Sequence, residues 1–244
     1  MSAERRPARP SRSLLGECRV AGVLACVATA GAATMLGAAL RLGPWYPRHT
    51  VMLVGGVMAV AASRIRSHHP WPHFGPANAV TSSRLVLVGL VGGLWEEPAS
   101  PDVAHAAALM GLAGVTLDGV DGFLARRTRM TSGFGARFDM EVDALLILAL
   151  AALVHHTGKA GPWVLASGLL RYGFVAAGWA WPWLARPLAY SRRRQAVCVL
   201  QIAGLLLALD PMTGARAGAW LSAIALGALT WSFAVDVLEL RAQR

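Results

Sequence analysis

The sequence predicts an all-α integral membrane protein, and three observations point to this fold class. Of the 244 residues, 55% are hydrophobic and only 15% are charged, which is too little charge to cover a soluble domain of this length. Apolar runs of about 20 residues, each long enough for a helix to cross a bilayer, recur along the chain. Loops that carry arginine separate these runs, as is typical of multi-pass membrane proteins.

Most of the chain consists of apolar segments, with glycine and proline turns between them. We expect helices over 20–40, 50–65, 79–95, 103–125, 135–155, 162–184, 195–209 and 216–238. The arginines before segment 20–40 resemble the start of a signal peptide, but this segment is too long for a signal and fits an uncleaved spanning helix. Segment 50–65 is short, so its full crossing stays open.

The distribution of positive charge predicts the orientation of these helices. If every segment crosses and the N-terminus is cytoplasmic, the outside loops hold only Arg41, Arg48, Lys159 and Arg216. Positive residues accumulate on the cytoplasmic side, so we expect a multi-pass protein of a bacterial inner membrane with a cytoplasmic N-terminus. The net charge of +10 is spread over several loops rather than gathered in one stripe, which argues against a nucleic-acid partner.

Four aspartates between residues 118 and 143 form the predicted chemical centre. The stretch from residue 118 reads Asp-Gly-Val-Asp-Gly-Phe-Leu-Ala-Arg. Successive residues of a helix are rotated by about 100°, so five residues of this stretch lie within roughly 140° of one another on one helix face. They are Asp118, Asp121, Gly122, Ala125 and Arg126. On the following helix, Gly135, Asp139 and Asp143 are spaced i, i+4 and i+8 and form a nearly straight stripe.

Placed side by side, these two helices aim four carboxylates at one point near the cytoplasmic surface. Such a group cannot stay ionised in a low-dielectric site without cations. Oxygen ligands in this number suit Mg²⁺ or Mn²⁺, and we expect two ions that share a bridging carboxylate. Two such ions bind a diphosphate and stabilise the charge of phosphoryl-type transfer. Glycine and alanine leave room for a nucleotide, and Arg126 suits phosphate oxygens.

Two other interpretations of the aspartates are weaker. Pairing with the neighbouring arginines at a membrane surface explains neither the spacing of the acids nor the small residues between them. A cation-coupled membrane transporter is the better alternative from a different class of protein, because acids inside a membrane often line ion paths.

The motif resembles the signature of the CDP-alcohol phosphatidyltransferases, Asp-x2-Asp-Gly-x2-Ala-Arg-x8-Gly-x3-Asp-x3-Asp. Every fixed position is matched, by Asp118, Asp121, Gly122, Ala125, Arg126, Gly135, Asp139 and Asp143. The resemblance implies a bundle of six transmembrane helices, here a catalytic domain over residues 75–244. Residues 1–74 would then comprise a cytoplasmic tail and about two extra transmembrane helices.

The resemblance also implies a role for each motif residue. The metal ligands would be Asp118, Asp121, Asp139 and Asp143. Asp143 would in addition activate the acceptor hydroxyl as a general base. The CDP moiety would contact Gly122, Ala125, Arg126 and Gly135.

The reaction that the resemblance implies is transfer of a phosphatidyl group from CDP-diacylglycerol to a small polar alcohol, with release of CMP, in phospholipid synthesis. The alternative within the same class is transfer of a CDP-linked headgroup to a lipid hydroxyl. The expected partners are therefore a CDP-linked lipid donor, a small alcohol and the surrounding membrane lipids, and a homodimer is left open.

A second, partial motif precedes the aspartates. Pro76, Asn78, Thr81 and Arg84 resemble the Pro-Asn-x-x-Thr-x-x-Arg pattern at the first core helix of the family, with one extra residue after the proline. Asn78 and Thr81 could equally be helix-capping residues. Arg84 lies well inside an apolar segment, so we expect it to face the protein interior or a polar cavity. It would there form a structural ion pair or bind phosphate.

Three arginines outside the motif are candidate contacts for the acceptor or a lipid headgroup, namely Arg137, Arg193 and Arg194. The run 192–194 could instead be a simple topology anchor. Ala144 follows the last aspartate, where relatives with a phosphorylated acceptor often carry Lys or Arg, and this disfavours such an acceptor. Arg137 could compensate, so the acceptor alcohol itself is not identified.

Overall fold

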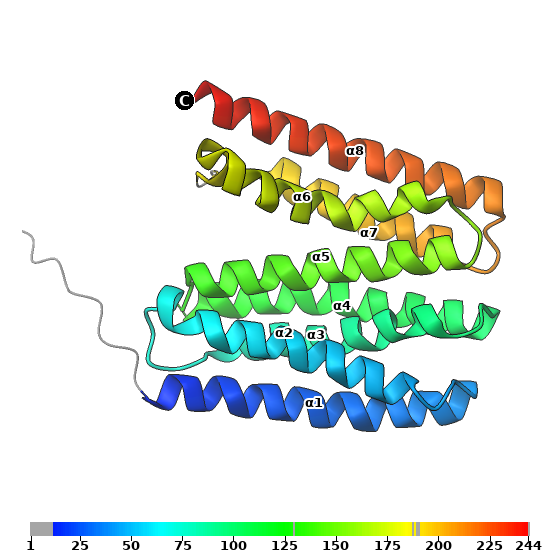
Figure 1. Cartoon of the computed structure of the whole chain (residues 1–244), viewed down its shortest axis with the longest axis horizontal. Helices are drawn as coiled ribbons and strands as arrows, with labels where there is room; N and C mark the ends of the chain where they lie inside the picture. The colour runs from blue at the N-terminus through cyan, green and yellow to red at the C-terminus, as the bar shows by residue number, and fades with distance from the viewer. Residues whose placement is uncertain (1–11, 129, 187, 189–190, 244) are drawn as a thin grey trace, which may run out of the picture. The chain divides into compact units, whose positions relative to one another are not determined.

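The protein is helical throughout the part of the chain that the structure describes. This computed structural model describes residues 12–128, 130–186, 188 and 191–243, and within the helices it places 12, 67, 68, 121, 125 and 126 by their backbone alone. The helices are α1 (Arg12–Leu40), α2 (Tyr46–His68), α3 (Pro76–Gly93), α4 (Pro101–Thr128), α5 (Gly133–His156), α6 (Ala166–Ala180), α7 (Arg192–Leu209) and α8 (Ala215–Ala242) (Figure 1). No strand occurs among these described residues, so the all-α prediction is confirmed.

Each predicted apolar segment corresponds to one of these helices except 162–184, which the structure divides. Its central part is α6, and short 3₁₀ helices precede and follow it at Pro162–Leu165 and Pro182–Ala185. Pro182 explains the second break, because a proline disfavours helical geometry at the residue before it and cannot donate a backbone hydrogen bond. The single long helix predicted over 162–184 is therefore wrong.

Four helices in the described part of the chain are long and apolar enough to cross a membrane: Ser13–Leu40, Pro76–Glu96, Pro101–Leu124 and Ala215–Ala242. Three of the other helices, α5, α6 and α7, lack one requirement or the other. Three acids lie in the first half of α5, α6 has only 15 residues, and α7 begins with three arginines. The four apolar helices indicate a membrane-embedded protein, while the crossing of the remaining segments stays a prediction.

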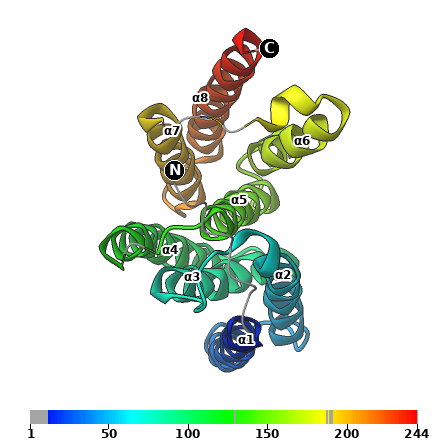
Figure 2. The same cartoon turned by 90° about the vertical axis from the view of Figure 1, so that its left-hand side faces the viewer.

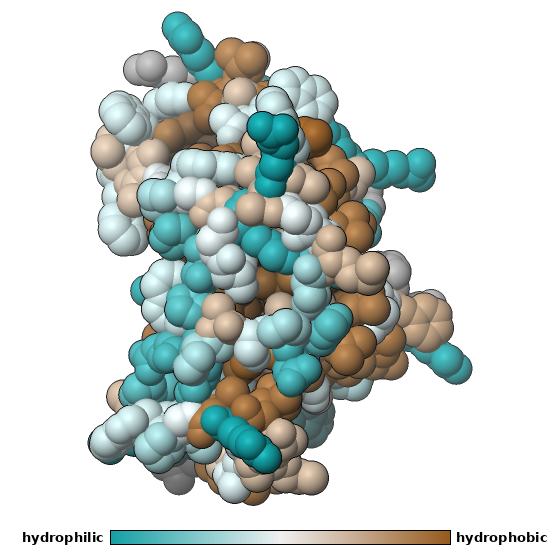
Figure 3. Space-filling view, turned by 90° about the vertical axis from the view of Figure 1, so that its right-hand side faces the viewer, coloured by the Kyte–Doolittle hydropathy of each residue, from teal (hydrophilic) through white to brown (hydrophobic). Residues whose placement is uncertain are grey.

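Exposed side chains along the helices support a lipid environment. On α1, Val23, Leu24 and Val27 are each more than 60% exposed, which would be costly in water but is expected against lipid. Figure 3 shows hydrophobic side chains beside hydrophilic ones on the face that it draws. Exposed apolar side chains along a helix are the pattern of helices that contact lipid.

The chain forms two compact units. The first comprises Met1–Gly93 and Ala113–Asp143, and the second comprises Leu94–Leu112 and Ala144–Arg244. α4 and α5 therefore each contribute residues to both units. The predicted motif, including all four aspartates, belongs to the first unit.

In the first unit, α1 and α2 pack against α3 (Figure 2). Two glycines one turn apart on α3 allow a close approach of α2. A Cβ atom at Gly89 would lie 2.5 Å from Val54 Cγ2, and one at Gly93 would lie 2.5 Å from Thr50 Cγ2. Such small residues are the usual means of bringing membrane helices together. The Tyr46 hydroxyl also donates to the backbone carbonyl of Leu90 at 2.8 Å.

The connection between α2 and α3 links α1 to the beginning of α5. One oxygen of the Glu17 carboxylate lies 2.8 Å from His73 Nδ1, and the other accepts the backbone N–H of Phe74 at 2.8 Å. In the same connection, His69 Nδ1 lies 2.9 Å from Ser132 Oγ, just before α5. These bonds hold together three segments that are distant in the sequence.

In the second unit, α7 packs along α8. The Lys159 ammonium, after α5, donates to the carbonyls of Leu209 and Asp210 at the end of α7, with the first bond at 3.1 Å. The Phe174 and Phe233 rings join α6 to α8, with centroids 5.5 Å apart. The first contact satisfies backbone carbonyls at the end of α7, and the second packs the apolar surfaces of α6 and α8 together.

Gly89→Ala should destabilise the protein by about 1–3 kcal/mol, because its new Cβ would overlap the buried Val54 side chain. The midpoint of thermal unfolding of the detergent-solubilised protein measures this. Val54→Ala in the same chain should restore part of the loss. Gly56→Ala is the matched control, since nothing lies within 4 Å of a Cβ there. An unchanged midpoint for Gly89→Ala would contradict the close approach of α2 and α3.

Candidate metal and catalytic site

Local capping signals determine where the two helices of the motif begin. Ser132 Oγ accepts the backbone N–H of Gly135 at 3.0 Å, which is the bond of an N-cap residue at the start of α5. Ser100 Oγ likewise accepts the N–H of Val103 at 3.2 Å, and Pro101 takes the favoured first position of α4. The starting residue of α5 places Asp139 and Asp143 on one face within its first three turns.

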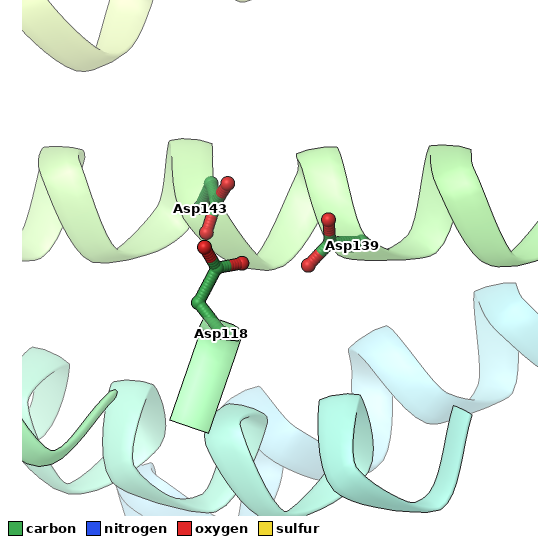
Figure 4. A group of neighbouring side chains, drawn as sticks. All are labelled: Asp118, Asp139 and Asp143. Atoms are coloured by element: carbon green, nitrogen blue, oxygen red, sulfur yellow. The ribbon is translucent and has the colours of Figure 1, made fainter. Parts of the chain in front are cut away.

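Three of the four predicted aspartates come together. Asp118 on α4 points toward Asp139 and Asp143 on α5 (Figure 4). Each offers a carboxylate oxygen, and these oxygens lie within 4.8 Å of one another. The three residues are half-buried, so the cluster is partly screened from solvent but can still be reached.

Other motif residues are placed less fully. The side chains of Asp121, Ala125 and Arg126 lie outside the described residues, although their backbone belongs to α4. Gly122 is half-buried on the same helix. Metal binding by Asp121 and nucleotide binding by Gly122, Ala125 and Arg126 therefore stay predictions.

Arg84 on α3 reaches all three clustered aspartates. Its side chain is buried, with a relative exposure of only 1% for the residue. Nη1 lies 2.9 Å from Asp118 Oδ1 and also pairs with Asp139. Nη2 pairs with Asp143, and Nε donates to the carbonyl of Gly114 at 3.2 Å. The expectation that Arg84 faces the interior is confirmed, and it forms ion pairs there.

Gly135 is a position of close helix contact. A Cβ atom there would lie 2.9 Å from Asn78 Oδ1 and 3.2 Å from Ser132 Oγ. Asn78 is buried inside α3 and donates its amide to the Phe74 carbonyl at 2.5 Å. This bond differs from that of an N-cap, whose side-chain oxygen accepts a backbone N–H. Asn78 therefore helps to pack α3 against the beginning of α5, whereas a contact between Gly135 and substrate stays a prediction.

The three arginines predicted as acceptor or headgroup contacts differ in their surroundings. Arg137 is exposed on α5. In the second unit, Arg193 lies 2.6 Å from Asp236 Oδ1 on α8, and Arg194 lies 3.3 Å from the same oxygen. Asp236 is buried, and we predicted no role for it from the sequence, although an acid within an apolar segment is a signal of such a pair. Acceptor binding by these arginines stays a prediction.

The donor set of the cluster fits a divalent cation. Carboxylate oxygens are the ligands that Mg²⁺ and Mn²⁺ prefer. Three carboxylates bring three negative charges, and the one positive charge of Arg84 leaves an excess at a partly buried site. Cations therefore stabilise the ionised cluster, and the cluster could hold them through Asp118, Asp139 and Asp143.

The chain also matches the model of a known protein family. Residues 74–235, well over half of the chain, match the family model of the CDP-alcohol phosphatidyltransferases. The chain belongs to the CDP-alcohol phosphatidyltransferase family. The resemblance seen in the motif is thus confirmed, and this CDP-alcohol phosphatidyltransferase transfers a phospho-alcohol group from a CDP-alcohol.

The extent of the match also bears on the N-terminal helices. It begins at residue 74, so α1 and α2 lie outside it. Members of the family generally depend on divalent metal, which agrees with the acid cluster. No solved structure matches the chain.

Gly135→Ala should lower the stability of this phosphatidyltransferase by about 1–3 kcal/mol, because the added methyl group would overlap the buried Asn78. Thermal unfolding checks this, with Gly119→Ala as control, since nothing lies within 4 Å of a Cβ at Gly119. Asn78→Ala combined with Gly135→Ala should recover part of the loss. Full stability of Gly135→Ala alone would contradict the contact.

Proposed function

We propose that this enzyme transfers the phosphatidyl group of CDP-diacylglycerol to the hydroxyl of a small polar alcohol and releases CMP. The observation that carries the proposal is the convergence of Asp118, Asp139 and Asp143 in a membrane-embedded member of the family. Clustered acids in such a chain suit a diphosphate substrate that is anchored in the lipid phase. Phospholipid synthesis is the process to which this reaction belongs.

Asp118, Asp121, Asp139 and Asp143 would hold Mg²⁺ or Mn²⁺, and we propose two ions. When bound, the ions neutralise the diphosphate and the charge that develops during transfer. Arg126 would bind phosphate oxygens of the donor, for which its planar fork is suited. Gly122, Ala125 and Gly135 would leave space for the CDP moiety.

Asp143 is proposed to accept the proton of the acceptor hydroxyl. The freed oxygen forms a bond to the phosphorus that carries diacylglycerol, and the bond from this phosphorus to the bridging oxygen breaks. CMP leaves with that oxygen, so the phosphatidyl group passes to the alcohol.

The acceptor is proposed to be unphosphorylated, because Ala144 follows the last aspartate in place of a basic residue. The pairs of Arg193 and Arg194 with Asp236 support this proposal, since they already balance part of the positive charge of these arginines. Transfer of a CDP-linked headgroup to a lipid hydroxyl is the second candidate and would use the same acids. The transporter alternative loses its support, because the family is one of transferases.

The proposed topology has a cytoplasmic N-terminus and a cytoplasmic site, in a bacterial inner membrane. The concentration of arginine in alternate loops supports this orientation. A six-helix catalytic domain over 75–244 with two additional N-terminal helices agrees with where the family match begins. Nothing among the described residues supports a homodimer.

Release of CMP from labelled CDP-diacylglycerol should require added Mg²⁺ or Mn²⁺ and stop in excess EDTA, because the clustered acids need cations. A panel of polar alcohols, with purified protein, identifies the acceptor through the lipid formed. Asp102→Asn, at an exposed acid in the first turn of α4, is the matched control and should leave CMP release unchanged. Undiminished release from metal-free protein in EDTA would refute the metal role. Labelled lipid formed only from a CDP-linked headgroup would favour the second candidate.

Asp143→Asn should lower turnover by roughly 10²–10⁴-fold, the usual contribution of a positioned acid–base group. Nucleotide affinity should survive better than in Asp118→Asn, because other carboxylates still hold metal. Titration with Mg²⁺ separates the roles, since a ligand defect is partly rescued at high Mg²⁺ and a base defect is not. Near-normal turnover of Asp143→Asn at saturating metal would show that another group activates the acceptor.

A further inference from the structure

Arg84 is a buried positive charge in direct contact with the predicted metal ligands. Its guanidinium contacts oxygens of Asp118, Asp139 and Asp143, which come from two helices other than its own. A guanidinium suits this task, because its five N–H donors lie in one plane and can serve several carboxylates at once. The contacts with Asp139 and Asp143 are charge-assisted hydrogen bonds, the stronger kind in a partly dry site, and the contact with Asp118 is an ion pair.

The backbone bond of Arg84 directs its side chain toward the acids. Nε donates to the carbonyl of Gly114, one helical turn before Asp118 on α4. This bond leaves the two terminal nitrogens for the carboxylates, Nη1 for Asp118 and Asp139, and Nη2 for Asp143. The arginine is therefore positioned by α4 as well as by α3.

The electrostatic consequence follows from the separations. Three carboxylate oxygens within 4.8 Å of one another repel strongly when no cation lies between them. Leaving a buried arginine without its acids, or the acids without their arginine, is costly for the same reason. A protein that has to stay folded before it binds metal therefore needs a positively charged side chain beside these carboxylates.

We propose that Arg84 is the resident counter-cation of the acid cluster: it holds the three carboxylates together in the absence of metal, and divalent cations bind in competition with it. The inference rests on the metal site of the proposed function, but not on the identity of the donor or acceptor. Arg84 thereby stabilises the metal-free protein and lowers its affinity for metal. It is a positioning residue, since it acts through the metal ligands.

The decisive comparison is Arg84→Gln against the unaltered protein, with Mn²⁺ alone as the probe. Free Mn²⁺ is measured by electron paramagnetic resonance during titration of detergent-solubilised protein without substrate. Arg84→Gln should bind Mn²⁺ at least about tenfold more tightly, because a nearby positive charge has been removed. In EDTA it should unfold at a lower temperature than the unaltered protein. Saturating Mn²⁺ should remove most of this difference in unfolding temperature.

Arg193→Gln is the matched control, because Arg193 also pairs with a buried aspartate, Asp236, which is not among the predicted ligands. It should lower the unfolding temperature equally with and without Mn²⁺ and leave Mn²⁺ affinity unchanged. The same behaviour from Arg84→Gln, or weaker Mn²⁺ binding by it, would overturn the proposal.

A double variant covers the case in which Arg84→Gln does not fold. Arg84→Gln with Asp118→Asn removes one charge of each sign, so it should be more stable in EDTA than Arg84→Gln alone, or fold where the single variant does not. A double variant that is no more stable than Arg84→Gln alone would contradict the counter-cation role of Arg84. If the unaltered protein binds no Mn²⁺, the metal site and this inference fail together, whereas unchanged Mn²⁺ binding in Arg84→Gln removes the inference alone.

Discussion

The ion pairs of Arg84 with Asp118, Asp139 and Asp143 join the three helices on which the site is built. A buried guanidinium among carboxylates requires each partner to be in place, because an unpaired charge in a dry interior costs several kcal/mol. This requirement constrains the rotation of α3, α4 and α5 about their axes. It also explains why a polar residue is tolerated deep inside an apolar helix.

Packing around these ion pairs determines the positions of the helices more closely than the charges alone can. Gly135 lets α5 approach Asn78, and the cap from Ser132 determines where α5 begins. In the connection before α3, the Phe74 backbone N–H bonds to Glu17 of α1, and His69 contacts Ser132 at the start of α5. The chain that leads into α3 is therefore held from two sides. α1 and α2 lie outside the family match, yet they are part of the unit that contains the acids. Their contribution to the site is support for α3.

The proposed chemistry follows from the excess of negative over positive charge at the acid cluster. One arginine cannot neutralise three carboxylates, so the cluster keeps an excess of negative charge, and this excess suits the divalent cations and the diphosphate donor of the proposed reaction. The half-buried position of the acids gives a dielectric low enough for these interactions to be strong. The apolar helices indicate that the enzyme is embedded in the membrane, where the proposed lipid donor would be concentrated.

Helix positions and the stripe of Asp139 and Asp143 could be predicted from the sequence, because periodicity determines which residues share a face of one helix. The motif likewise sufficed for the family. Which helix faces which is set by contacts between distant residues, and spacing does not encode these. Only the tertiary structure therefore placed Arg84 against the acids, Asn78 against Gly135, and Arg193 against Asp236. It also divided segment 162–184, where hydropathy alone had concealed the effect of Pro182 on the backbone.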